Sequence, residues 1–215
     1  MKLRGIIFDL DGVIVSTDEL HFQAWKKISD EEKIFFDREI NERLRGISRM
    51  ESLEIVLEKA KRSYTDEQKQ SLAARKNQYY QALLPQLSPQ NLLAGVADCL
   101  VELKKQGIRV GVGSSSKNCC SILERIGLGN YFDAVVDGTQ ISRSKPDPEV
   151  FLKAAAELGI LPEEALVIED AAAGVEAALA AGMKVLAVGA AEHDIRATKQ
   201  AHALSEISVF ELINL

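Results

Sequence analysis

The chain has 215 residues, 47% of them hydrophobic and 27% charged, which is enough apolar material for a buried core and excludes a disordered chain. Its formal net charge of -6 disfavours a nucleic-acid or membrane partner, because both select a basic surface. No apolar stretch is long enough for a membrane span or a signal peptide, and the odd count of 3 cysteines fits a reducing compartment. We therefore expect a cytoplasmic globular protein whose cysteines are small buried hydrophobic residues.

The predicted elements fall into two blocks. Residues 3–10 form an apolar run that ends in acidic residues and glycine, which is typical of a buried parallel strand. From about residue 18 to residue 84 we expect only helices, with capping boxes at Ser48 and Thr65 and no strand pattern. Beyond residue 85 the two patterns alternate, with predicted helices at 96–106, 117–126, 149–158 and 172–181 and predicted strands at 108–112, 134–136, 165–168 and 185–188.

Alternating strands and helices predict a parallel sheet that is covered on both faces. The predicted fold class is α/β, with a doubly wound parallel-sheet (Rossmann-like) core domain of residues 1–16 and 86–215 and an inserted helical cap domain of residues 17–85. The cap would lie beside the carboxyl ends of the strands, where open α/β sheets bind ligands. The tail after Gly189 is weakly patterned. Left-handed caps are predicted where glycines follow helices, at Gly107, Gly127, Gly159 and Gly182.

Two carboxylates follow the first strand in the string Phe8-Asp9-Leu10-Asp11-Gly12. Asp9 would face the crevice and Asp11 would fold back from the loop, so that one attacks while the other moves protons. A lone aspartate at a strand end is as often a turn or a helix cap. The complete string favours catalysis.

Glu169 and Asp170, at the end of another predicted strand, supply further hard oxygen ligands. Acids as close as Asp9 and Asp11 raise one another's pKa, so an ionised Asp9 benefits from a cation. Oxygen-only ligation is what Mg²⁺ prefers, and we predict a magnesium site made by Asp9, Asp11, Glu169 and Asp170. Asp170 could also cap the helix that follows it.

A phosphate seat is predicted at Ser114, which follows the strand of residues 108–112 and precedes a helix opening near Lys117. Lys145 ends another strand-to-helix connection and would reach the same phosphate oxygens as a point charge. Either residue alone would more often be an ordinary loop residue. The phosphate site is supported because Ser114 and Lys145, together with Asp9 and Asp170, follow four different strands of one sheet.

These residues resemble, in order, the four motifs of the haloacid dehalogenase superfamily of phosphotransferases: Asp9-Leu10-Asp11-Gly12, Ser114, Lys145 and Glu169-Asp170. The resemblance extends from Gly5 to about Gly189 and is strongest to a sugar phosphomutase branch. It implies a phosphoaspartate formed on Asp9, proton transfer by Asp11 and Mg²⁺ as cofactor. The implied reaction moves a phosphoryl group between β-glucose 1-phosphate and glucose 6-phosphate through a bisphosphate, and the implied partner is a small sugar phosphate bound by a monomer.

Four further strings resemble the same branch, at residues 21–25, 44–49, 75–77 and 116–118. The resemblance implies that Arg49 holds the distal phosphate with help from Lys117 and Asn118, while His21 and Lys76 contact the sugar and the catalytic loop. The full implied set of substrate and phosphate contacts is Thr17, His21, Trp25, Arg49, Lys76, Ser114, Ser115, Lys117, Asn118 and Lys145.

Without the resemblance the cap residues have simpler interpretations. His21 and Trp25 are four apart on a predicted helix, which favours a core role. Arg49 and Lys76 would be solvated surface charges. One position departs from the family pattern: Ser16 stands where the family usually has an aspartate, so the linker to the cap lacks a carboxylate and we expect cap closure and sugar orientation to be affected.

Two other functions fit part of the pattern. A phosphatase of the same superfamily would use water in place of the sugar hydroxyl, but the predicted cap residues Arg49, Lys76 and His21 disfavour it. A non-catalytic phospho-acceptor module also carries an aspartate on a parallel sheet. The second carboxylate of Asp11 and the inserted cap disfavour that function, because a slow switch needs neither proton transfer nor substrate enclosure.

Overall fold

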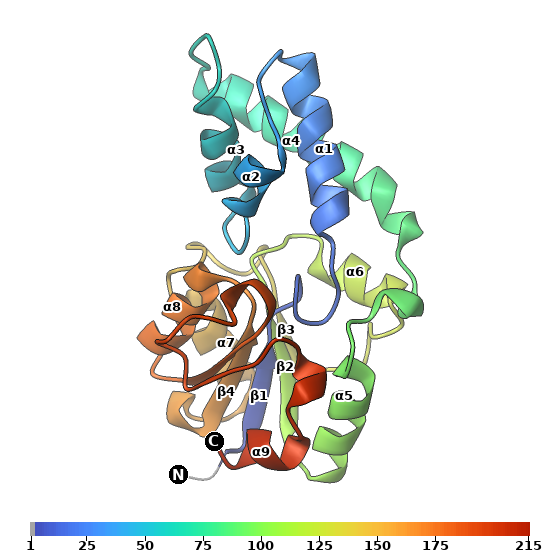
Figure 1. The fold of residues 1–215 in the computed structure, drawn as a ribbon, viewed down its shortest axis with the longest axis vertical. Helices are drawn as coiled ribbons and strands as arrows, with labels where there is room; N and C mark the ends of the chain where they lie inside the picture. The colour runs from blue at the N-terminus through green and yellow to red at the C-terminus, as the bar shows by residue number, and fades with distance from the viewer. Residues whose placement is uncertain (1–2) are drawn as a thin grey trace.

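The computed structural model describes residues 3–215, and Figure 1 shows a sheet flanked by helices beneath a second, wholly helical body. The six strands of the sheet are parallel and lie in the order β3-β2-β1-β4-β5-β6. Their bounds are β1 Gly5–Phe8, β2 Arg109–Gly113, β3 Ala134–Val136, β4 Ala165–Glu169, β5 Lys184–Ala187 and β6 Lys199–Gln200. Because β1 pairs with β2 and β4, the residues that follow these three strands meet at one edge of the sheet.

Helices cover both faces of this sheet, as the alternation of side chains along β1 requires. Ile6 and Phe8 belong to a core shared with residues of α5, α6 and α9, whereas Ile7 belongs to a core shared with α7 and α8. The bounds of these helices are α5 Val96–Lys105, α6 Cys119–Arg125, α7 Glu149–Leu158, α8 Ala172–Ala180 and α9 Val209–Ile213. The predicted doubly wound α/β class is confirmed.

The upper body in Figure 1 contains α1 Asp18–Glu31, α2 Arg38–Glu42, α3 Arg49–Leu57 and α4 Asp66–Leu83. It has its own apolar core, in which Trp25, Ile28 and Leu53 are almost completely buried. Residues 18–83 contain no strand, as expected. Over the described residues 3–215 we find no helix with both the length and the apolar character of a membrane span.

Local signals in the sequence fix several helix ends. The capping boxes predicted at Ser48 and Thr65 are both formed, each with a reciprocal hydrogen bond to the residue three positions later. The four glycines predicted to end helices all have positive φ, with values of 70° at Gly107, 80° at Gly127, 64° at Gly159 and 75° at Gly182. Short 3-10 turns cover residues 84–86, 89–91, 162–164, 189–191 and 204–206.

Two local expectations are wrong, and the tail contains elements that the sequence did not predict. Helix α6 begins at Cys119 instead of near residue 117, because residues 114–118 are held in a hydrogen-bonded loop. The weakly patterned tail adds the sixth strand and α9, since a two-residue edge strand needs no apolar run. Of the three cysteines, which are all free, Cys120 is exposed and only the other two are buried.

Candidate active site

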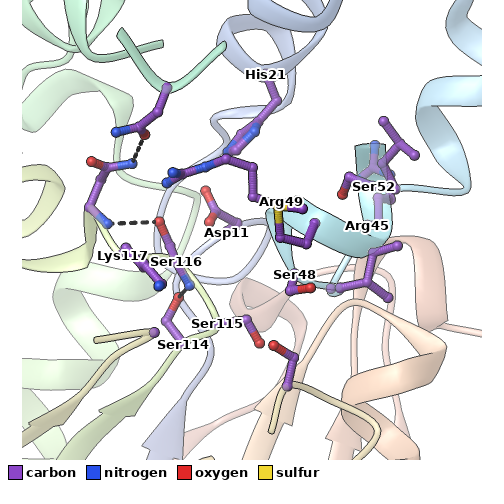
Figure 2. Close-up of a pocket in the computed structure, with 18 of the residues that line it drawn as sticks. Asp11, His21, Arg45, Ser48, Arg49, Ser52, Ser114, Ser115, Ser116 and Lys117 are labelled. Atoms are coloured by element: carbon purple, nitrogen blue, oxygen red, sulfur yellow. Dashed lines mark hydrogen bonds between the residues drawn. The ribbon is translucent and has the colours of Figure 1, made fainter. Parts of the chain in front are cut away.

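A cavity of about 480 Å³ lies between the carboxyl ends of the strands and the helical body above them. In Figure 2, His21 and Arg49 approach it from the helices while Asp11 and Ser114 approach it from the sheet. The predicted site residues that line it are Asp9, Asp11, His21, Trp25, Arg49, Lys76, Ser114, Ser115, Lys117, Asn118 and Asp170. The others, Thr17, Lys145 and Glu169, lie just behind its wall, where Thr17 contacts Asp11 and Lys145 contacts Asp9 and Glu169.

Lys145 is a buried cation beneath the sheet side of the cavity. Its Nζ lies 2.5 Å from Asp9 Oδ1 and 2.5 Å from Glu169 Oε1, and the side chain is 1% exposed. Burial alone would lower the pKa of Lys145, but the two carboxylates outweigh burial and the pKa is raised. Lys145 therefore stays charged and fixes the orientation of Asp9.

Three buried carboxylates gather around this lysine. Oxygen atoms of Asp9, Glu169 and Asp170 lie within 4.8 Å of one another. Burial, followed by the charges of Glu169 and Asp9, raises the pKa of Asp170 to about 9, and burial raises the pKa of Glu169 to about 7. The negative charge exceeds what one lysine balances, so the residues fit a hard divalent cation with oxygen ligands.

The carboxylate of Asp11, the fourth predicted ligand, lies outside this group, and its contact with a metal ion stays a prediction. Asp170 does not cap α8, because the N-cap of this helix is Ala171. The backbone N–H of Ala171 donates a hydrogen bond to Glu169 Oε2 at 2.9 Å. The side chain of Asp170 is thereby left to face the cavity.

The glycine of the string Asp9-Leu10-Asp11-Gly12 has a steric role. Gly12 has φ of 81°, and a Cβ at this position would lie 2.0 Å from Asp170 Oδ2. Any other residue would push the loop away from the acidic group. The close approach of the first loop to the end of β4 therefore depends on Gly12.

Asp11 is held toward the linker that leads into α1. The hydroxyl of Thr17, which is 1% exposed, donates a hydrogen bond to Asp11 Oδ1. Burial, followed by the charge of Asp9, raises the pKa of Asp11 to about 7. A carboxyl group with such a pKa can both accept and return a proton near neutrality.

The loop after β2 forms the next part of the floor. Ser114 Oγ accepts a hydrogen bond from the Ser116 N–H at 3.1 Å, and Ser116 Oγ accepts one from the Asn118 N–H at 3.3 Å. Ser115 lines the cavity, and its buried hydroxyl has no hydrogen-bond partner within residues 3–215. Ser114 and Ser115 therefore lie at the cavity in the loop that leads into α6, and their contact with a phosphate stays a prediction.

Asn118 ties the sheet side to α4. Its Oδ1 accepts from Gln81 Nε2 at 3.0 Å, and its Nδ2 donates to Asn77 Oδ1 at 2.9 Å. Both ends of the amide are therefore engaged by the helical body. The direct phosphate contact implied for Asn118 stays a prediction.

The helical side of the cavity contains a buried lysine. Lys76 is 2% exposed and lies 2.8 Å from His21 Nδ1, beneath the rings of Trp25 and Tyr80. Burial and the nearby Arg49 lower the pKa of Lys76 well below its usual value. Burial, followed by Lys76, does the same to the pKa of His21.

Arg49 and Lys117 are two further basic side chains of the cavity. Both line the cavity, Arg49 from the first turn of α3 and Lys117 from the loop after β2. In the part of the chain that the structure describes, neither they nor Lys76 form an ion pair with a carboxylate. The cavity lining therefore combines carboxylates at the ends of β1 and β4 with basic side chains from α3, α4 and the loop after β2.

Several residues outside the predicted set of site residues also belong to the site. Arg45 and Asp18 line the cavity and form an ion pair, and Arg45 also contacts Asp170. Asn77 and Gln81 hold Asn118. No periodicity or motif spacing joins residues so far apart, although the helical pattern puts Asn77 and Gln81 on one face of α4.

Comparison with known proteins agrees with this architecture. Residues 6–188 match the family of haloacid dehalogenase-like hydrolases. The chain is 48% identical to the β-phosphoglucomutase of Bacillus subtilis over 87% of this chain and 84% of that protein. It is 29% identical to a phosphorylated carbohydrates phosphatase of Thermotoga maritima over 99% of this chain and 98% of that protein. A crystal structure of β-phosphoglucomutase from Clostridium difficile superimposes with a TM-score of 0.92 at 36% identity, covering 99% of this chain and 96% of that one.

Proposed function

The chain belongs to the haloacid dehalogenase-like hydrolase family, and we propose that it is a β-phosphoglucomutase that interconverts β-glucose 1-phosphate and glucose 6-phosphate. The observation that carries the proposal is the cavity that contains Asp9 together with Arg49 and Lys76 from the cap and Lys117 from the loop after β2. Within residues 3–215 these three basic side chains form no ion pair. A sugar bisphosphate has two anionic ends. One would be transferred at Asp9 while the other is held by the cations.

We propose the division of the chain into a catalytic core of residues 1–16 and 86–215 and a cap of residues 17–85. The two bodies of Figure 1 support these limits, which fall at the linkers before α1 and after α4. One chain supplies both sides of the cavity, which supports a monomer as the active unit. The free cysteines support the cytoplasm as the working compartment.

In the proposed reaction Asp9 carries the phosphoryl group as a phosphoaspartate. A carboxylate oxygen of Asp9 attacks the phosphorus of the bisphosphate, and the bond from phosphorus to the sugar oxygen breaks. Lys145 orients Asp9 through its 2.5 Å contact. The hydroxyl groups of Ser114 and Ser115 would receive the phosphoryl oxygens as charge spreads over them.

Mg²⁺ is the proposed cofactor, held by Asp9, Glu169 and Asp170, with Asp11 as the further predicted ligand. The close oxygen atoms and the raised pKa values of Glu169 and Asp170 support this choice. When bound, the ion would neutralise charge on the transferred phosphoryl group.

Asp11 is the proposed acid and base. It would protonate the sugar oxygen that leaves in the first transfer and deprotonate the hydroxyl that attacks in the second. Its pKa of about 7 suits both roles. Thr17, which donates to Asp11 from the cap linker, would set the direction in which the carboxyl points.

The cap residues account for the difference between a mutase and a phosphatase. The bisphosphate that forms when Asp9 returns its phosphoryl group to a sugar phosphate must turn without leaving, and the phosphoaspartate must be kept from water. Arg49 and Lys117 would hold whichever phosphate is distal to Asp9, and Lys76 with His21 would contact the sugar. A phosphatase needs only one phosphate site, so these cations support the mutase.

The test is a coupled assay of α- and β-glucose 1-phosphate with Mg²⁺ in which glucose 6-phosphate and free phosphate are recorded together. We expect glucose 6-phosphate from the β anomer with little free phosphate. The α anomer serves as the matched control substrate. Rapid release of phosphate without isomerisation would refute the mutase and support the phosphatase.

A further inference from the structure

Arg45 is the cation through which the cap contacts the acidic end of the sheet. It lies between α2 and α3, in the segment that Figure 1 shows descending from the helical body toward α8. Its three guanidinium nitrogens face three carboxylates from three parts of the chain. Nε lies 2.7 Å from Glu42, Nη2 lies 2.5 Å from Asp18 and Nη1 lies 3.4 Å from Asp170.

The three carboxylates that contact Arg45 belong to different parts of the fold. Glu42 is the last residue of α2 and belongs to the cap itself. Asp18 is the first residue of α1, directly after the linker between the two bodies. Asp170 follows β4 in the core and is 5% exposed. One planar side chain thus joins the cap, the linker and the core, a geometry that a lysine with its single nitrogen does not reproduce.

A second contact between the cap and the core lies next to this ion pair. Gly46, next to Arg45, has φ of 73°, and a Cβ on it would lie 2.8 Å from the Cβ of Ala171. Ala171 is the neighbour of Asp170. Two consecutive cap residues therefore meet two consecutive core residues, with an ion pair beside a close steric contact.

The carboxylate that contacts Arg45 lies at the start of α1 and not in the linker. The linker residue Ser16 is exposed and carries no charge, while Asp18, two residues later, is half-buried and pairs with Arg45. The carboxylate that the linker lacks at Ser16 is therefore present at the start of α1. There it can hold Arg45 in the orientation that reaches Asp170.

We propose that Arg45 is a positioning residue, an electrostatic latch that holds the cap closed on the core by joining Asp18 to Asp170. The latch lies at the α8 side of the cavity, and the amide contacts of Asn118 tie the cap at the α6 side. Closure at both sides is what would keep water from a phosphoaspartate, and for this consequence alone the latch rests on the proposed function.

Cap closure can be measured without substrate or activity because Trp25 is the one tryptophan of the chain and lies in the cap. In a Cys120→Ser background, Glu176→Cys gives an exposed thiol on α8 for a fluorophore that accepts tryptophan emission. Energy transfer from Trp25 to this label falls when the cap moves away from α8. The measurement uses the full chain without added metal.

The variants are Arg45→Ala, Arg45→Lys, Asp18→Asn and the double variant Arg45→Ala with Asp18→Asn. Arg43→Ala is the matched control, because among residues 3–215 the ion pair of Arg43 is with Glu58, inside the cap. We expect a lower transfer efficiency in Arg45→Ala and Asp18→Asn, a similar loss in the double variant, incomplete rescue in Arg45→Lys, and no change in Arg43→Ala. Unchanged transfer in Arg45→Ala, with its circular dichroism as in the parent, would overturn the latch.

A kinetic measurement then separates the latch from the proposed function. If the chain is a mutase, Arg45→Ala should release several-fold more free phosphate per glucose 6-phosphate, while Arg43→Ala keeps the parent ratio. An unchanged ratio would overturn the protective role. If no isomerisation occurs in the parent, the proposed function fails while the energy-transfer result still decides the latch.

Discussion

The two sides of the cavity differ in how their buried lysines are paired with carboxylates. At the end of the sheet, Lys145 is buried against Asp9 and Glu169, so its charge has partners within the protein. On the helical side, Lys76 is equally buried and contacts the ring of His21 and the faces of two aromatic rings, and burial lowers its pKa. A buried charge without a partner is costly in the free protein. The sheet side is therefore organised before a ligand arrives, whereas the cap side is completed by an anionic ligand.

The largest effect expected from this comparison is the loss of the nucleophile. Asp9→Asn keeps the size of the side chain but removes the oxygen anion, so the isomerisation rate should fall by roughly 10⁶, the scale on which removal of a nucleophile acts elsewhere. The coupled assay measures it, with Asp98→Asn on the exposed side of α5 as the control. Turnover that survives in Asp9→Asn would contradict the phosphoaspartate, and turnover that vanishes excludes a non-catalytic phospho-acceptor.

Asp11→Ala should reduce the rate less, by about 10² to 10⁴, which is the usual contribution of a positioned acid and base. Substrate affinity should change little, because the cations that hold the phosphate remain. Single-turnover kinetics and equilibrium binding separate the two quantities. An unchanged rate would show that Asp11 does not move the proton.

The contrast in charge pairing predicts opposite effects on stability. Lys145→Met leaves two buried carboxylates without their cation and should lower the free energy of unfolding by about 3–5 kcal/mol. Lys76→Met removes a buried charge that has no counter-ion, so the free energy of unfolding should stay equal or rise, while binding of a sugar bisphosphate weakens. Urea unfolding of the metal-free proteins measures both. Equal destabilisation by the two substitutions would contradict the difference in charge pairing between Lys145 and Lys76.

The smallest expected effect concerns the pH dependence of the free energy of unfolding, to which two histidines contribute with opposite signs. Burial and Lys76 lower the pKa of His21 below 6.5, so the unfolded chain binds a proton that the folded chain does not, and this contribution makes stability rise as pH approaches 6.5. Glu192 raises the pKa of the exposed His202, so its contribution is present below pH 6.5 and is lost as pH rises through the folded pKa.

Unfolding measured between pH 5.5 and 7.5 in His21→Asn and His202→Asn should therefore change the pH slope in opposite directions. His21→Asn should flatten the rise, and His202→Asn should remove a fall. A common direction of change would mean that His21 is not buried beside a cation in solution.

The sequence was most informative where function requires a fixed chemical group at the end of a strand. The string from Asp9 to Gly12, with Ser114, Lys145 and Asp170, follows separate strands, and parallel strands bring their ends to one edge whatever the helices between them do. The capping boxes and the helix-ending glycines were readable for the same reason, because each depends only on a few neighbouring residues. The two-residue strand β6 was missed since its pairing depends on β5 and leaves no local pattern.

The sequence by itself therefore determined the α/β alternation, the helical insert and the set of groups that gather at the sheet edge. Only the tertiary structure decided which of those groups are paired. It put Lys145 against carboxylates, left Lys76 without one, turned Asn118 toward Gln81, and brought Arg45 to Asp18 and Asp170. Burial and charge pairing depend on distances between residues far apart in the chain, and such distances exist only after the cap has packed over the sheet.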